Sequence, residues 1–311
     1  MKILNFGSLN LDYVYTVDHM AAAGETLASE GLQVFCGGKG LNQSIALAKA
    51  GIGVYHAGLI GKDGENLLQA CRDAGVHTAY IEEAGEKTGH AIIQVDHSGQ
   101  NCILLYGGAN RNITKEFVDR VLADFAEGDL LLLQNEISQL DFIIDRAYEK
   151  GMEIILNPSP YDENIGRCDL SKVSLFLLNE IEGNQMTGET DPDRILDRLQ
   201  EMYPGAEAVL TLGSGGSVYQ DGKQRIRQGI FPVQVADTTA AGDTFTGYFL
   251  ASRMEGRSAE ECLRRASRAA AIAVSRAGAA QSIPEREEVD AFTISEEASE
   301  YCFTRPNQSR E

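Results

Sequence analysis

The chain has 311 residues, 43% of them hydrophobic and 23% charged, which excludes an intrinsically disordered or low-complexity protein. Its 27 basic and 46 acidic side chains give a net charge of −19, which argues against nucleic acid or an anionic membrane surface as a partner. No apolar run approaches the roughly 18 residues of a membrane-spanning helix, and the six cysteines form no close pair. We therefore expect reduced thiols and a cytoplasmic location.

Short apolar strands alternate with amphipathic helices along most of the chain. The expected strands are 2–7, 54–59, 129–133, 152–156, 174–178 and 208–212, and the expected helices are 40–50, 64–74, 114–125, 140–150, 194–202, 244–254 and 259–276. Unbroken apolar strands of this kind are buried on both faces. The pattern therefore predicts an α/β fold with a doubly wound, mostly parallel sheet covered by helices, as one domain over residues 1–311.

Four further segments break this alternation and predict a small antiparallel sheet beside the main one. They lie at about 12–18, 31–36, 88–96 and 100–106, and His97-Ser98-Gly99-Gln100 between the last two is a hairpin signal. We expect this small sheet to serve as a lid, as a dimer surface, or as both.

The most specific motif is Asp237-Thr-Thr-Ala-Ala-Gly-Asp243-Thr-Phe-Thr-Gly247, which leads into a helix. The N–H groups of Ala241, Gly242 and Asp243 would point out of the helix N-terminus and form an anion hole for a phosphoryl group in transfer. Asp243 would then accept the proton of a substrate hydroxyl. The alternative is an ordinary N-cap with a glycine turn, although a cap does not require so long a string.

A second glycine-rich string, Gly37-Gly38-Lys39-Gly40-Leu41-Asn42-Gln43, opens another helix. Its backbone amides, Lys39 and Asn42 could hold a polyhydroxy or anionic ligand; the alternative is a flexible turn followed by an N-cap. The string is not a Walker A loop, and the chain contains no Gly-x-Gly-x-x-Gly. The sequence therefore disfavours a P-loop NTPase and a dinucleotide-binding Rossmann enzyme.

Polar residues follow three of the expected strands, at the edge where open α/β sheets bind their ligands. Asn10 and Asp12 share one face after the first strand and could bind sugar hydroxyls, and Glu136 lies in the equivalent place after 129–133. Asn179 and Glu182 could orient hydrated Mg²⁺ and phosphate. The alternatives are a polar turn, a surface acid, and an Asn cap with acids in the first helical turn.

Two segments in the C-terminal half complete the candidate site. Thr211-Leu-Gly213-Ser214-Gly215-Gly216 follows a strand and could cover the phosphates or ribose of a nucleotide; the alternative is a tight turn. The carbonyl groups of 273–282 could coordinate a monovalent cation near Asp237; the alternative is an ordinary glycine C-cap.

Together these segments resemble the ribokinase-like (phosphofructokinase-B) carbohydrate kinase family, in order and from Gly7 to about Phe292. Both signature regions of that family are present, the first followed by Gly58-Leu-Ile-Gly61-Lys-Asp63. The resemblance implies that Asp243 is the general base and that Ala241 and Gly242 complete the anion hole. It also implies four groups of binding residues: Asn10, Asp12, Gly38, Lys39, Gly40, Asn42, Glu136 and Asp243 for the sugar; Asn179, Thr211, Gly213, Ser214, Gly216 and Gly242 for the nucleotide; Asn179 and Glu182 for Mg²⁺ through water or phosphate; and Asp237, Thr239, Ala273, Arg276, Gly278 and Ser282 for K⁺.

The activity that this resemblance implies is transfer of the γ-phosphoryl group of ATP to the 5-hydroxyl of D-ribose, giving ribose 5-phosphate. Mg²⁺ and an activating K⁺ are the expected cofactors. The resemblance further implies that the small sheet closes over the site to exclude water and that it joins two subunits in a homodimer.

The identity of the acceptor stays open at this point. Leu11 and Leu41 lie inside the sugar-binding strings, where the family often has smaller residues, and a bulkier lining could redirect the pocket. Deoxyribose, another pentose, a ketohexose or a nucleoside are the alternatives, because one methyl group changes preference by only about 1–3 kcal/mol. A non-catalytic sugar-binding regulator is the alternative from another class, which the presence of Asp243, Gly242, Lys39 and Asn42 disfavours.

Overall fold

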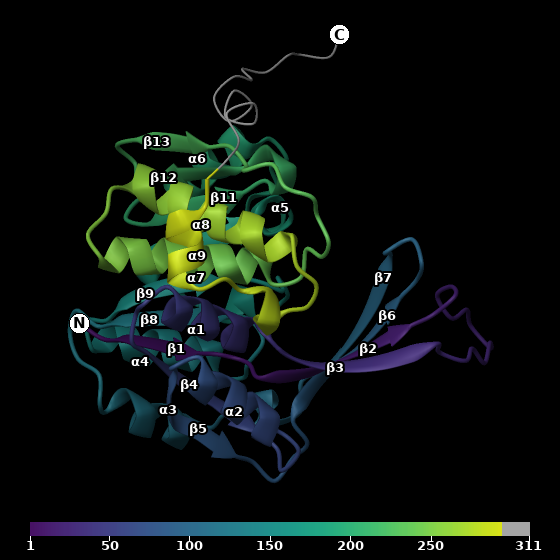
Figure 1. The fold of residues 1–311 in the computed structure, drawn as a ribbon. Helices are drawn as coiled ribbons and strands as arrows, with labels where there is room; N and C mark the ends of the chain where they lie inside the picture. Colours follow the sequence, from purple (N-terminus) through teal and green to yellow (C-terminus); the bar gives the residue numbers. More distant parts are fainter. Residues whose placement is uncertain (294–311) are drawn as a thin grey trace.

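A large sheet forms the centre of the molecule (Figure 1). The computed structural model describes residues 1–293, and the rest of the expected 1–311 domain lies outside the described residues. In spatial order the strands are β13 (Arg225–Gln228), β12 (Ser217–Gln220), β11 (Glu207–Thr211), β10 (Leu175–Asn179), β9 (Glu153–Asn157), β8 (Leu130–Gln134), β1 (Ile3–Phe6), β4 (Val54–Ile60) and β5 (His77–Glu83). All ladders from β11 to β5 are parallel, and β12 and β13 add an antiparallel hairpin at one edge.

Helices cover both faces of this sheet, as predicted. One face carries α1 (Lys39–Lys49), α2 (Glu65–Asp73), α7 (Ala241–Met254), α8 (Ala259–Val274) and α9 (Arg286–Ala291), and the other carries α3 (Lys115–Leu122), α4 (Leu140–Glu149), α5 (Glu180–Thr187) and α6 (Pro192–Met202). Short 3₁₀ turns occupy Gly108–Arg111, Ile165–Arg167, Leu170–Lys172, Gly213–Gly215 and Ala280–Ser282. Successive strand residues point to opposite faces, so Leu130 and Leu131 belong to different core clusters.

The small sheet is present and projects from the main body (Figure 1). Its order is β3 (Gly31–Gly37), β2 (Asn10–Thr16), β6 (Gly89–Val95) and β7 (Asn101–Tyr106). The two outer ladders are antiparallel, as predicted, but the central ladder between β2 and β6 is parallel. The reason is that both central strands start at the main body, where Asn10 pairs with Gly89, and run outward.

Several elements carry too weak a sequence signal to be predicted. Strand β5 alternates poorly and ends in two acids, β12 and β13 have only four residues each, and α5 is the polar segment after β10. Helix α7 also begins three residues earlier than expected, at Ala241. Strands β5 and β13 are the two edges of the sheet, and β12, α5 and the first turn of α7 are short or polar, so apolar periodicity is weak in all of them.

Helices α1 and α7 pack closely, and this contact places the two glycine-rich motifs side by side. Gly247 makes the approach possible: a Cβ at this position would lie 2.4 Å from Ala46 Cβ and 2.9 Å from the backbone of Ala46 and Leu47. A side chain of any size would therefore push the two helix N-termini apart.

We predict that Gly247→Ala destabilises the protein by about 1–2 kcal/mol, because overpacking exceeds the helix-propensity gain of about 1 kcal/mol. Urea denaturation followed by circular dichroism measures the loss. The matched control is Gly205→Ala, since a Cβ at Gly205 would meet no atom within 4 Å. Equal stability of the two variants would contradict the prediction.

Candidate active site

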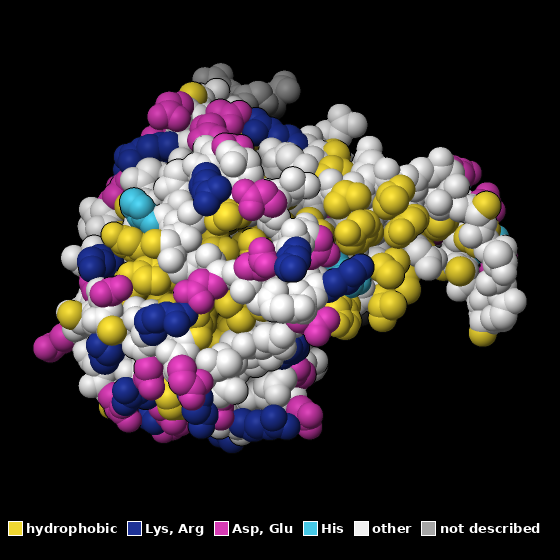
Figure 2. Space-filling model, turned by 90° about the horizontal axis from the view of Figure 1, so that it is seen from below, with side chains coloured by type: hydrophobic (Ala, Val, Ile, Leu, Met, Phe, Trp, Pro, Cys, Tyr) yellow, Lys and Arg dark blue, Asp and Glu magenta, His cyan; other side chains and the backbone are white. Residues whose placement is uncertain are grey.

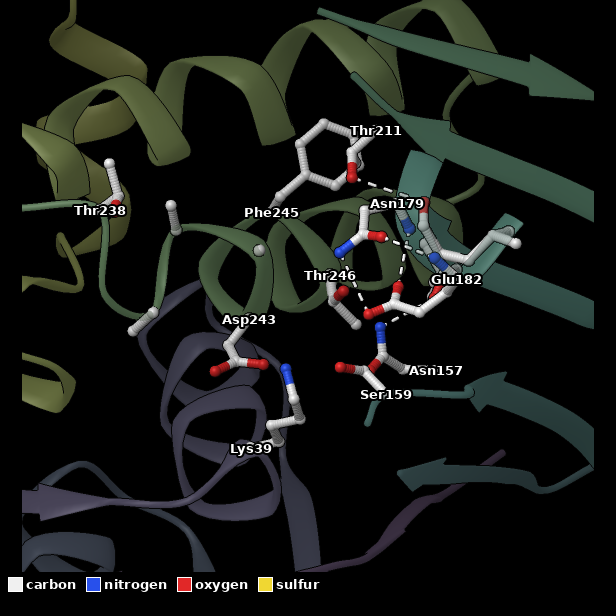
Figure 3. A pocket seen from close by; sticks show the side chains of 15 residues that line it. Lys39, Asn157, Ser159, Asn179, Glu182, Thr211, Thr238, Asp243, Phe245 and Thr246 are labelled. Atoms are coloured by element: carbon white, nitrogen blue, oxygen red, sulfur yellow. Dashed lines mark hydrogen bonds between the residues drawn. The ribbon is translucent and has the colours of Figure 1, made fainter. Parts of the chain in front are cut away.

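The carboxyl ends of β9, β10 and β11 and the first turn of α7 enclose a cavity of about 230 Å³ (Figure 3). Asn157, Asn179 and Thr211 end the three strands and supply polar side chains along one side. Lys39, the first residue of α1, and Asp243, in the first turn of α7, lie at another side. The two specific motifs of the sequence therefore meet at one cavity.

Helix α7 begins directly after a residue in the left-handed region. Ala240 has φ 58° and ψ 7°, which residues with a side chain seldom adopt, and it lines the cavity. The sharp turn exposes the N-terminal amides of α7, which carry partial positive charge. The amide of Ala241 donates to Thr238 O at 3.3 Å, whereas a Cβ on Gly242 would meet no atom within 4 Å. The cavity is thus open at Gly242.

Asp243 is buried, with 7% of its surface exposed, and two amide side chains hold its carboxylate. Gln43 Nε2 donates to Oδ1 at 2.9 Å, and Asn42 Nδ2 donates to Oδ2 at 3.0 Å. Sequence reasoning identified Asn42 but assigned nothing to Gln43, although both stand in the same string. Two donors on adjacent residues of α1 aim the carboxylate and stabilise its charge.

The ammonium group of Lys39 lies beside Asp243 at the cavity (Figure 3). Burial opposes its positive charge, but Asp243, Glu136 and Glu182 outweigh burial and raise the pKa of Lys39 above its ordinary value. The side chain is therefore a fixed cation next to the α7 N-terminus, suited to an anionic ligand.

Strand β2 brings Asp12 to the same acidic region. Burial, followed by the charges of Glu136 and Asp243, raises the pKa of Asp12 from 3.8 to about 7. Gly37 on the neighbouring strand makes room for this carboxylate, since a Cβ there would lie 1.9 Å from Asp12 Oδ2. Asn10, two residues earlier, is buried and accepts a bond from Asn110 Nδ2 at 2.8 Å.

Glu136 is not a free surface acid, because its carboxylate makes hydrogen bonds that support the structure. Its Oε2 accepts hydrogen bonds from Ser8 Oγ and from the backbone N–H of Lys39, the latter at 3.1 Å. It therefore satisfies the first amide of α1, while Oε1 takes part in neither bond.

Asn179 and Glu182 form a capping box at the start of α5, as the alternative interpretation of their sequence expected. Asn179 Oδ1 accepts from the amides of Ile181 and Glu182, and Glu182 accepts from Asn179 N at 2.8 Å and Nδ2 at 3.1 Å. Both side chains still line the cavity (Figure 3). Sequence reasoning missed their neighbour Asn157, whose buried Oδ1 has no hydrogen-bond partner within residues 1–293.

A second cavity of about 510 Å³ adjoins the first and shares five lining residues with it: Thr211, Thr238, Ala241, Gly242 and Phe245. The predicted loop residues Gly213, Ser214 and Gly216 line it. Its other lining residues are mostly apolar and come from 230–235 and α8: Ile230, Phe231, Pro232, Val233, Val235, Ala270, Ala271 and Val274. Sequence reasoning missed this apolar wall; the run Ile230-Phe-Pro-Val was its only signal. A flat heteroaromatic group fits such a surface.

The predicted cation region is partly assembled around Asp237. Its Oδ1 accepts from Thr239 N at 2.9 Å and Oγ1 at 2.7 Å, and its Oδ2 accepts from Gly278 N at 3.0 Å. Burial opposes the charge, but these hydrogen bonds together lower the pKa of Asp237. Two loops far apart in sequence are thereby tied around one carboxylate.

Other residues of the predicted cation region make their hydrogen bonds and ion pairs with groups other than Asp237. Arg276 pairs with Glu288, and Ser282 Oγ donates to Ala279 O at 2.8 Å. Ala273 O accepts from Arg276 N at 3.1 Å. Ala273, Arg276 and Gly278 have no side-chain oxygen, so they could reach a cation through main-chain oxygen only.

Leu11 and Leu41 belong to the hydrophobic core, 5% and 0% exposed, and neither lines either cavity. Both side chains pack into the core cluster, so the expectation of a bulkier pocket lining finds no support at these two cavities. Among residues 1–293, no group of three His, Cys, Asp or Glu side chains could hold a metal ion. In the same range, no helix is long and apolar enough to span a membrane.

A doubly wound α/β domain in which a helix N-terminus and a buried carboxylate meet beside a cavity has the architecture of a small-molecule kinase. The chain matches the model for pfkB family carbohydrate kinases over residues 1–286, and it belongs to that family. The fold prediction and the resemblance drawn from the motifs are thus confirmed.

Relatives cover nearly the whole chain. A ribokinase of Haemophilus influenzae is 37% identical, over 92% of this chain and 96% of its own, and a ribokinase of Arabidopsis thaliana is 35% identical over 91% and 78%. Among solved structures, Arabidopsis ribokinase complexed with ribose and ATP has a TM-score of 0.81 and 30% identity, covering 94% of this chain and 99% of that one. Ribokinase from Cryptococcus neoformans in complex with ADP has a TM-score of 0.82 and 31% identity, over 93% and 98%.

The raised pKa of Asp12 gives a testable pH dependence of stability. The stabilisation that protonated Asp12 gives the folded state is fully present below the unfolded pKa of 3.8, and it is lost as pH rises through the folded pKa of about 7. We predict that the free energy of unfolding of Asp12→Asn, taken relative to that of the unchanged protein, rises by about 2–3 kcal/mol from pH 5 to pH 8.

Urea denaturation of the ligand-free protein at several pH values measures this difference. The control is Asp73→Asn, since Asp73 is exposed and its carboxylate accepts from an amide, Gln69 Nε2 at 2.6 Å, and not from a titrating group. A stability difference between Asp12→Asn and the unchanged protein that does not vary with pH would contradict the prediction.

Proposed function

We propose that the protein transfers the γ-phosphoryl group of ATP to the 5-hydroxyl of D-ribose, giving ribose 5-phosphate. The observation that carries the proposal is the buried Asp243 carboxylate, held by Asn42 and Gln43 at the open N-terminus of α7. The ribokinase relatives, at up to 37% identity, support ribose as the acceptor. The Arabidopsis ribokinase complex with ribose and ATP supports the pair of substrates.

In this proposal the sugar binds where β2, the α1 motif and Glu136 converge. The residues proposed for it are Asn10, Asp12, Gly38, Lys39, Gly40, Asn42, Glu136 and Asp243. Carboxylates and amides of this kind accept and donate hydrogen bonds to several hydroxyl groups at once. Asp243 would accept the proton of the 5-hydroxyl, which raises the nucleophilicity of that oxygen as it attacks.

The transferred group would sit at the N-terminus of α7. The amides of Gly242 and Ala241 and the Lys39 ammonium would stabilise the charge that spreads over its equatorial oxygens. Ala241 N–H would exchange its long bond to Thr238 O for this ligand. Positioning and charge neutralisation supply most of the rate in such reactions.

The nucleotide would occupy the second cavity, with its base against the apolar wall of 230–235 and α8. The residues proposed for it are Asn179, Thr211, Gly213, Ser214, Gly216 and Gly242. Mg²⁺, bound with ATP, would neutralise charge on the phosphates. Asn179 and Glu182 fit an outer role through water or phosphate, because their oxygens already serve the capping box.

A K⁺ ion would bind beside the anion hole at Asp237, Thr239, Ala273, Arg276, Gly278 and Ser282. The ionised Asp237 carboxylate and main-chain oxygens are donors that suit a hard monovalent cation. The hydrogen bonds that Asp237 accepts from Thr239 and Gly278 favour this proposal, since they hold both loops at one point. Asp237 would stiffen the loop that leads into α7.

The small sheet is proposed as the lid of a single α/β domain and as the contact between two subunits. Figure 2 shows side chains of hydrophobic type gathered over it. Exposed members on one face are Leu32, Val34, Ile92, Leu104 and Tyr106, which the strand register places side by side. Patches of this kind mark interaction surfaces. A cytoplasmic location goes with this proposal, since the substrate ATP and free thiols belong there.

We predict that Asp243→Asn lowers kcat by about 10²–10⁴-fold with a smaller change in KM, because proton removal in the transition state is lost. Coupled detection of ADP release with ribose measures it, and Asp221→Asn in an exposed turn is the control. Near-normal turnover of Asp243→Asn would rule out the assigned base.

The same assay with 2-deoxyribose, fructose and nucleosides, each with and without K⁺, tests acceptor and cation. The proposal expects selective turnover of ribose that K⁺ raises. Better turnover of another acceptor would support the kinase activity but contradict ribose as the acceptor. Equal rates with and without K⁺ would contradict the proposed K⁺ site.

The proposed homodimer is tested at two neighbouring residues of β7 that point to opposite faces of the small sheet. Ile103 and Leu104 are 57% and 66% exposed. We predict that Ile103→Glu or Leu104→Glu converts a dimer to a monomer in light-scattering chromatography, because a charge in an apolar contact is costly. A monomeric unchanged protein, or a dimer that survives both changes, would contradict the proposal.

A further inference from the structure

A chain of buried side-chain hydrogen bonds runs from Asp243 into the centre of the main sheet. Beyond the bond from Gln43 to Asp243, Gln43 Oε1 accepts from Gln134 Nε2 at 2.6 Å. Gln134 Nε2 also donates to Asn5 Oδ1 at 3.0 Å. Gln43, Gln134 and Asn5 are each 0% exposed. Polar groups this deeply buried are costly unless they are bonded, so their arrangement is tightly constrained.

The far end of the chain sets the orientation of every amide in it. Asn5 Nδ2 donates to two acceptors, Gly40 O at 2.7 Å and Ser44 Oγ at 2.8 Å. Its Oδ1 must therefore face Gln134, which has to present its NH₂ group. Both N–H groups of Gln134 are then used, on Asn5 and on Gln43. Gln43 consequently turns its oxygen to Gln134 and its NH₂ to the carboxylate.

His56 closes the chain at its inner end. Ser44 Oγ lies 2.8 Å from His56 Nδ1, and both residues are fully buried. Burial lowers the pKa of His56 from 6.5 to about 4, so the ring is neutral near pH 7. In the tautomer that carries its proton on Nε2, Nδ1 accepts a hydrogen bond from the Ser44 hydroxyl. The Ser44 oxygen is then an acceptor for Asn5, and the direction of the chain is the same from end to end.

Gln134 is an expensive residue in this place. Its Oε1 is buried without a hydrogen-bond partner in the described part of the chain, and it lies 2.4 Å from where a Cβ on Gly7 would be. An apolar side chain of similar size would fill the space without an orphaned oxygen. The N–H end of Gln134 is therefore the part that the site uses.

We propose that Gln134 is a positioning residue for Asp243, which acts through Gln43 by fixing the NH₂ end of that amide toward the carboxylate. The inference rests on the proposed function, because it takes Asp243 as the base. Without Gln134, Gln43 Oε1 loses its donor, and the amide is free to leave Asp243 or to turn its oxygen toward it. Either change weakens the hold on the charged carboxylate.

Other charged groups lie near Asp243, and their electrostatic effects must be distinguished from the effect of Gln134. Asp243 and Glu136 act through their charges on Asp12 and Lys39, which raises the pKa of both groups. Within residues 1–293, their hydrogen bonds do not involve Gln134. A substitution of Gln134 therefore leaves those charges in place and changes the amide chain alone.

The test is a double-mutant cycle with Gln134→Met, Gln43→Met and the combined variant, with Gln220→Met as the matched control. Gln220 is also a buried strand glutamine, 6% exposed, and it donates to Leu196 O at 3.0 Å away from the site. We expect Gln134→Met to lower kcat with ribose about 10-fold, with KM for both substrates within about twofold. The acid limb of its kcat profile moves to higher pH, which a merely structural role would not do.

In the Gln43→Met background, Gln134→Met should change kcat by less than about twofold, because its route to Asp243 is gone. Gln134→Glu presents an oxygen where the NH₂ stood and should lower kcat further than Gln134→Met. Independent, multiplying effects of the two Met substitutions would overturn the inference. So would a kcat and pH profile of Gln134→Met that match those of Gln220→Met in folded protein.

A readout without turnover separates this inference from the proposed function. Side-chain amide resonances of Gln43 and Gln134 are assigned in ¹H–¹⁵N spectra by their loss in the Met variants. Asp243→Asn should then shift both pairs of resonances, whether or not the unchanged protein phosphorylates ribose. If the unchanged protein is inactive, only the proposed function is contradicted. If the resonances do not shift, the inferred chain of hydrogen bonds is contradicted.

Discussion

The site depends on holding one buried carboxylate, that of Asp243, by hydrogen bonds inside the protein. A buried ionised group costs several kcal/mol unless polar partners replace water. Asp243 receives those partners from three sources: the amides of Asn42 and Gln43, the nearby Lys39 cation, and the partial positive charge of the α7 N-terminus. All three require α1 and α7 to begin at the same place, which the close approach at Gly247 permits.

The fold and the outline of the site could be predicted because their signals are local. Apolar strands of five residues between amphipathic helices specify a sheet covered on both faces, and the two glycine-rich strings stand directly before helices. In a parallel sheet the strand ends lie along one edge, so Asn179 and Thr211 could be placed on that edge from the sequence, although it is the pairing of β10 with β11 that makes them neighbours.

What could not be predicted depends on contacts between distant segments. Gln43 and Gln134 are ordinary polar residues in sequence, and only the packing of α1 on β8 joins them. Leu11 sits in a polar string yet belongs to the core, because alternate residues of β2 face opposite sides. The parallel central ladder of the small sheet has the same origin, since strand direction is set by where each strand leaves the main body.

Strand β2 links the two parts of the site mechanically. It begins with Asn10 and Asp12 in the acidic region and continues outward as a central strand of the small sheet, hydrogen-bonded on both sides. A strand held by two ladders moves with its sheet, because slipping would break a row of hydrogen bonds and reverse the facing of its side chains. Gly37 constrains it further, since the Asp12 carboxylate fills the space that any larger residue would need. Asp12 is therefore tied through β2 to the ladders of the small sheet, whereas the partners of Asp243 stand on α1 of the main body, so the acidic region joins the two sheets.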